Sequence, residues 1–201
     1  MRVLAALVVA GVLLAGCTEE RGTGPLPGPT RVDVDTPKLK ELKQEAGVEP
    51  CVPGEGEPVD GGLPEVTLAC LGGGEDVDLS TLRGPMVINV WASWCGPCRT
   101  EMPVLQSFHE QYGDRVPVLG INWQDVQAIA AMELVVDAGV TYPLLADPNA
   151  SFGIVDGMPI RGLPGIVLLD ADGGIAYRAL EDLESEQELV DLVETELGVT
   201  L

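Results

Sequence analysis

Apolar and polar positions along residues 64–201 alternate in a way that predicts both strands and helices. Apolar runs predict buried strands at residues 86–91, 116–121 and 166–169. A tight turn at Asp172-Gly173-Gly174 predicts a hairpin partner at residues 175–177. Helices are expected at residues 96–112, from Asp125 as N-cap to Gly139, and after the capping box Ser185-x-x-Glu188. The order βαβ, α, ββα predicts an α/β fold whose mixed sheet is parallel in its first half.

Residues upstream of this pattern have a different composition. Residues 18–63 contain 8 Gly and 7 Pro among 46 positions, a density about twice that of residues 64–201. This shift predicts a linker followed by one domain, with residues 17–63 as the linker and residues 64–201 as the domain. Within the linker, Thr36-Pro37 as a start and Gly47 as a stop predict a short helix, which is marginal unless it docks on the domain.

The first residues have the pattern of an export signal. Arg2 precedes an uninterrupted apolar stretch at residues 3–15, which ends in Leu14-Ala15-Gly16-Cys17. This ending resembles a bacterial lipobox, in which cleavage after residue 16 leaves a lipidated cysteine. We therefore expect residues 1–16 to be removed and Cys17 to anchor the protein to a membrane outside the cytoplasm. The alternative is an ordinary signal peptide that contains a cysteine.

Composition narrows the class of protein. The chain has 201 residues, of which 46% are apolar, and a formal net charge of −21. The apolar fraction is sufficient for a packed core. The acidity argues against nucleic acid as a partner and against charge-driven binding to anionic lipids. No apolar run reaches the roughly 18 residues expected of a membrane-spanning helix.

A pair of cysteines follows the predicted strand at residues 86–91. Cys95 and Cys98 lie at the expected start of the helix at residues 96–112, where unpaired N–H groups and the helix dipole stabilise a thiolate. Pro97 suits the first turn of a helix because it lacks an N–H. A zinc site would need two further ligands, which Cys51 and Cys70 could in principle supply. The one histidine, His109, lies too far along the same helix and is expected at the surface. Trp-Cys-Gly-Pro-Cys after an apolar strand is a more specific signal than the bare spacing of a zinc half-site. The pattern therefore predicts a redox site without metal or cofactor.

The motif Trp94-Cys95-Gly96-Pro97-Cys98 resembles the active site of the thioredoxin superfamily. Pro103 matches the kinking proline of that family's active-site helix, and Leu163-Pro164 resembles its cis-proline loop. The resemblance implies a thioredoxin-like fold, with a central mixed sheet flanked by helices. It also implies that Trp94, Gly96, Pro97, Leu163 and Pro164 contact the substrate.

The similarity is closer to TlpA/ResA-like membrane-anchored thiol-disulfide oxidoreductases. It rests on the lead-in at residues 78–84, on Asn89 and Glu101 near the cysteines, and on a central insertion at residues 125–149. Gly165 departs from the pattern. The family places an acid where Glu101 stands, which implies that Glu101 transfers the proton of Cys98. Spacing alone leaves a solvated first-turn glutamate as the alternative.

The remaining cysteines form a second candidate pair. If Cys17 carries lipid and Cys95 pairs with Cys98, then Cys51 and Cys70 are left to form a disulfide. Such a bond would staple the linker to a strand expected near residues 65–70, which an oxidising compartment permits. A second redox relay and free thiols are the alternatives.

The resemblance implies a function as a disulfide reductase for exported proteins such as apocytochrome c, with electrons from a membrane thiol carrier. A disulfide-forming oxidase is the main alternative, because Gly-Pro between the cysteines does not fix the direction. A peroxidase would need a Thr-x-x-Cys setting, and a copper-delivery module would need a nearby histidine ligand. The sequence around Cys95 provides neither.

Overall fold

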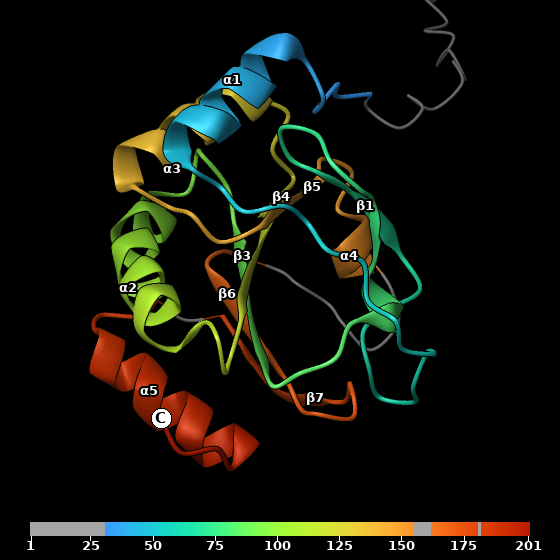
Figure 1. Cartoon of the computed structure of the whole chain (residues 1–201), viewed down its shortest axis with the longest axis vertical. Coiled ribbons are helices and arrows are strands. Elements are labelled where there is room, and N and C mark those ends of the chain that lie inside the picture. The colour runs from blue at the N-terminus through green and yellow to red at the C-terminus, as the bar shows by residue number, and fades with distance from the viewer. Residues whose placement is uncertain (1–30, 155–161, 181) are drawn as a thin grey trace, which may run out of the picture.

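The computed structural model describes residues 31–154, 162–180 and 182–201. These residues form one seven-stranded sheet and the helices that pack on it (Figure 1). The strand order is β2-β1-β5-β4-β3-β6-β7. The strands are β1 Thr67–Cys70, β2 Val77–Asp78, β3 Met86–Trp91, β4 Val118–Trp123, β5 Leu144–Asp147, β6 Gly165–Leu169 and β7 Ile175–Ala179. β4 pairs in parallel with β3 and β5, and the other pairings are antiparallel. The predicted mixed sheet of a thioredoxin-like fold is confirmed.

Helices cover the sheet on both faces. They are α1 Pro37–Ala46, α2 Gly96–Tyr112, α3 Ala128–Ala138, α4 Ser151–Ile154 and α5 Glu186–Leu197, with a 3-10 turn at Leu79–Thr81. On one face α1 lies beside α3 and α2 beside α5 (Figure 1). The 3-10 turn, α4 and the segment that contains Cys51 and Leu63 pack on the other face. Among the described residues, no helix is both long and apolar enough to cross a membrane.

The alternation of β3 separates the two faces. Val87 and Trp91 are fully buried against the face covered by α2, and Asn89 is directed to that same face by the period of two. Ile88 and Val90 are fully buried against the opposite face. The active-site helix α2 begins just beyond the carboxyl end of β3, so this end of the sheet carries the candidate site.

The short helix expected in the linker forms and docks. Thr36 Oγ1 accepts a hydrogen bond from Leu39 N, and Gly47 ends α1 in the left-handed conformation. Leu39 and Leu42 are buried in the same core cluster as Ala131 of α3. Docking against α3 explains why so short a helix is ordered.

Three sequence expectations need correction. The strand expected at residues 116–121 begins at Val118. Pro117 has no N–H to donate to a neighbouring strand, and its carbonyl accepts the last hydrogen bond of the pairing, from Val87 N. Helix α3 begins at Ala128 with Gln127 as N-cap, so Asp125 is not the cap. The spacing of Ile129, Met132 and Val136 predicts a shared buried face, but Ile129 is 45% exposed, because α1 covers the face that carries Ala131 and Met132. The sequence analysis also missed β2, β5 and α4.

Candidate active site

The two cysteines of the motif occupy different environments at the start of α2. Cys95 is the N-cap, and its Sγ accepts a hydrogen bond from Cys98 N at 3.2 Å. The structure joins the two sulfurs in a disulfide. Cys95 is 5% exposed and Cys98 is fully buried. Only Cys95 therefore offers an incoming sulfur any approach, and it lies where the helix dipole favours a thiolate.

The loop that carries Cys95 is fixed on both sides of Ser93. Asp125 Oδ2 accepts a hydrogen bond from Ser93 N at 2.6 Å, and Arg99 Nε donates to Ser93 O at 3.1 Å. Burial alone would raise the pKa of Asp125, but hydrogen bonds from Ser93, Gln127 and Asn122 outweigh it and lower the pKa. Asp125 is thus an ionised anchor for the active-site loop.

Sequence reasoning missed this role, because Asp125 lies 32 residues from Ser93. The parallel pairing of β3 with β4 places the ends of both strands together, and only that pairing makes the contact visible.

Trp94 forms a rim beside the disulfide. It is 52% exposed, and its indole N–H donates to Gln124 O at 3.2 Å. Gln124 has a φ of 51°, a left-handed conformation that non-glycine residues rarely adopt. The remaining tryptophans, Trp91 and Trp123, are buried.

The loop before β6 reaches the same end of the sheet. The antiparallel register pairs Gly165 with Val90, near the end of β3. The preceding Leu163–Pro164 bond is cis, and Pro164 is buried while Leu163 is half-buried. Gly96 and Pro97 are exposed at the first turn of α2. The substrate-binding residues implied by the resemblance are therefore positioned around one end of the sheet.

Glu101 lies one helical turn from Cys98 and is fully buried. Its Oε1 accepts a hydrogen bond at 3.0 Å from Asn89 Nδ2 on β3. Burial raises the pKa of Glu101 to about 8, and hydrogen bonds from the Leu183 backbone and Asn89 only partly oppose it. The solvated alternative for Glu101 is therefore wrong. A buried carboxyl group with this pKa can exchange a proton near neutral pH.

The structure also joins Cys51 and Cys70 in a disulfide, with Cα atoms 5.9 Å apart. Both sulfurs belong to the core cluster on the face opposite α2. His109 is more covered than a surface histidine, with 12% of its side chain exposed and Nε2 3.1 Å from Glu49 Oε1. Cys17 lies outside the described residues.

A family comparison agrees with this geometry. The sequence model of the Redoxin family matches residues 58–194, which include both cysteines of the motif and Pro164. The chain belongs to the Redoxin family. Its structural neighbours confirm the thioredoxin-like architecture predicted from the motif.

Individual relatives of this Redoxin chain are thiol-disulfide exchange proteins. It is 35% identical to the thiol:disulfide interchange protein DsbE of Vibrio cholerae, over 56% of this chain and 59% of that protein. It is 28% identical to the thiol-disulfide oxidoreductase ResA of Bacillus thuringiensis, over 57% of this chain and 65% of that protein. The chain thus covers less than two thirds of either relative.

One solved structure is matched over a larger share of its own chain than these two relatives are. The secreted thiol-disulfide isomerase of Corynebacterium glutamicum aligns with a TM-score of 0.60 and 27% identity. The alignment covers 68% of this chain and 86% of the isomerase.

Proposed function

We propose that this Redoxin-family protein is a thiol-disulfide oxidoreductase that reduces disulfides in exported proteins. The observation that carries the proposal is the asymmetric pair at the start of α2. Cys95 is 5% exposed among exposed neighbours, whereas Cys98 is fully buried and Glu101 is buried one turn away. The names of its relatives, DsbE and ResA, point to the same class of reaction.

The reaction begins from the reduced pair. The Cys95 thiolate attacks one sulfur of a client disulfide, which forms a mixed disulfide and releases the other client sulfur as a thiolate. Glu101, in its ionised form, accepts the proton of Cys98. The Cys98 thiolate then attacks Cys95 Sγ and releases the second client thiolate. The client gains two electrons, and the protein ends in the disulfide state that the structure contains.

The resemblance to TlpA/ResA-like proteins supports a reductive direction, apocytochrome c as a client and a membrane thiol carrier as the electron donor. The net charge of −17 over residues 64–201 would favour basic clients weakly. The redox state of Cys95 and Cys98 in cells tests the direction. Acid trapping and alkylation should find the pair mainly reduced, whereas a mainly oxidised pair would indicate an oxidase.

Trapping of clients tests the division of labour. Cys98→Ser removes the resolving thiol, so reductant-sensitive complexes with client proteins should accumulate. Cys95→Ser removes the attacking thiolate and should accumulate none, although its Cys98 thiol remains. Non-reducing gel electrophoresis compares the two variants. Equal trapping by both would contradict the assigned roles.

We also propose that lipid on Cys17 holds the protein at a membrane outside the cytoplasm. The lipobox-like ending at residues 14–17 supports this proposal. Cys17→Ser should move the protein from the membrane fraction to the soluble fraction. A variant that still sediments entirely with membranes would refute the anchor.

A further inference from the structure

The Cys51–Cys70 disulfide lies against a lysine of α1. Lys43 of α1 places Nζ 3.0 Å from Cys70 Sγ and donates a hydrogen bond to Gly73 O at 2.8 Å. Asp35 acts on the Lys43 ammonium and opposes the lowering of its pKa by burial. A positive charge in contact with one sulfur favours release of that sulfur as a thiolate.

Three successive glycines make this contact possible. Gly72, Gly73 and Gly74 have φ values of 80°, 86° and 135°. A Cβ on Gly72 would lie 2.9 Å from Lys43 Cβ, and one on Gly74 would lie 3.1 Å from Cys70 Sγ. The run of glycines therefore lets the chain close around the lysine and the sulfur, which side chains would prevent.

The other sulfur also has a partner suited to the reduced state. Cys51 Sγ lies 3.3 Å from Leu144 O. A disulfide sulfur carries no proton, so this contact becomes a hydrogen bond only when Cys51 is a thiol. The surroundings thus provide for a thiol at Cys51 and a thiolate at Cys70.

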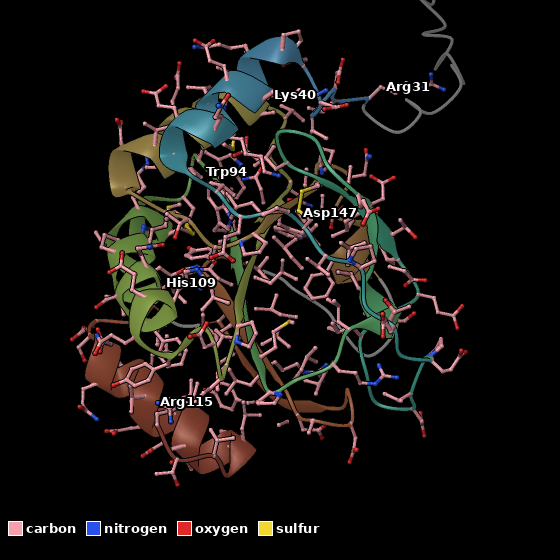
Figure 2. The ribbon with its side chains drawn as sticks, viewed as in Figure 1. Arg31, Lys40, Trp94, His109, Arg115 and Asp147 are labelled. Carbon is pink, nitrogen blue, oxygen red and sulfur yellow. A yellow bond between two sulfur atoms is a disulfide. The ribbon has the colours of Figure 1, made fainter. Side chains whose placement is uncertain are left out.

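An open pocket leads to this disulfide. It has a volume of about 500 Å³, and Cys51, Lys43, Gly74 and Lys40 are among the residues that line it. Lys40 is the lysine labelled on α1 in Figure 2. Cys51 lines the pocket and is 4% exposed, whereas Cys70, which is 2% exposed, lies behind it. A small thiol can enter a space of this size.

We propose that Cys51–Cys70 is a second thiol-disulfide exchange site, whose substrate is a thiol of low molecular mass. The substrate thiolate attacks Cys51 Sγ, which forms a mixed disulfide and breaks the bond to Cys70. Cys70 leaves as a thiolate paired with Lys43. A second substrate thiolate then attacks the substrate sulfur of the mixed disulfide and releases Cys51, which takes a proton. Two substrate thiols are oxidised to one disulfide as the protein pair is reduced.

This proposal does not depend on the proposed function, because the test removes the first pair. The full-length chain with Cys95→Ser and Cys98→Ser is treated with glutathione, and mass spectrometry of alkylated peptides follows Cys51 and Cys70. The reduction rate should rise in proportion to glutathione concentration. A rate independent of glutathione concentration would show that reduction requires unfolding, and would overturn the proposal.

Lys43 provides the decisive variant. Lys43→Gln keeps a donor for Gly73 O but removes the charge, so reduction should slow about tenfold through the poorer leaving group. Lys38→Gln, an exposed lysine on the same helix, should leave the rate unchanged. In denaturant, Lys43→Gln should react as fast as its parent. Reduction of folded Lys43→Gln at or above the parent rate would overturn the proposal. A rate above that of the parent would show that the substitution only destabilises the fold around the disulfide.

Discussion

At the scale of single residues, two buried carboxyl groups near the cysteines have opposite properties. Asp125 receives N–H groups from Ser93 and Gln127 and the amide of Asn122, so its pKa is lowered despite burial. Glu101 has fewer hydrogen bonds, and burial raises its pKa to about 8. The first therefore suits an anchor for the loop, and the second suits proton exchange.

Glu101 should make the stability of the oxidised protein depend on pH. Its folded pKa of about 8 exceeds the ordinary value of 4.5. As the pH rises through this interval, the unfolded chain has released a proton that the folded chain retains. The free energy of unfolding should therefore fall, by at most about 1.4 kcal/mol per pH unit. Glu101→Gln should remove this slope in urea titrations. Exposed Glu196→Gln should retain it, and an unchanged slope in Glu101→Gln would contradict the raised pKa.

Asp125→Asn should loosen the loop that carries Cys95. Ser93 N would lose a charged acceptor in a buried position, which should lower the free energy of unfolding by about 1–3 kcal/mol at neutral pH. Because the folded pKa of Asp125 is lowered, this difference should shrink as the pH falls through the acidic range. Chemical denaturation at neutral and at acidic pH measures this difference in the free energy of unfolding. Asp114→Asn, at an exposed position, is the control. A loss that is equal for the two variants would remove the anchoring role.

At the scale of elements, local signals account for what could be predicted. β3 and α2 have the bounds expected from the sequence, because an unbroken apolar run and a proline-containing helix start specify them locally. The caps of α1, Thr36 and Gly47, were also evident. β5 was missed because its four residues follow Pro143 and are defined by pairing with β4 and β1. In the same way, the cysteine motif was evident from the sequence. The hydrogen bond that Ser93 N donates to Asp125 was not, because it depends on how the strands pair.

Docking of α1 on α3 should contribute measurably to stability. Leu39 is 1% exposed and belongs to the core cluster that contains Ala131 and Met132. Leu39→Ala should lower the free energy of unfolding by about 2–5 kcal/mol, because it leaves a cavity between packed elements. Its exposed neighbour Lys38→Ala should change stability by no more than about 0.5 kcal/mol. Urea unfolding measures the change for both variants. If Leu39→Ala lowers the free energy of unfolding no more than Lys38→Ala does, α1 is not docked in solution.

At the scale of the whole molecule, the two faces of the sheet separate the two disulfides. The face covered by α2 and α3 carries Cys95, Cys98 and Glu101. The opposite face is closed by the segment that contains Cys51, which the second disulfide ties to β1. Residues N-terminal to the sheet therefore contribute to both faces, α1 to one and Cys51 to the other.

This arrangement predicts different costs for losing each disulfide. Cys51 and Cys70 are 19 residues apart, so Cys51→Ala with Cys70→Ala should lower the free energy of unfolding by about 3 kcal/mol through the larger entropy of the unfolded chain. Cys95 and Cys98 are 3 residues apart, and removing that bond should cost only about 2 kcal/mol by the same argument. Urea unfolding under non-reducing conditions compares both double variants with the parent. A smaller cost for the Cys51–Cys70 variant than for the Cys95–Cys98 variant would show that the N-terminal segment is already held to β1 without its disulfide.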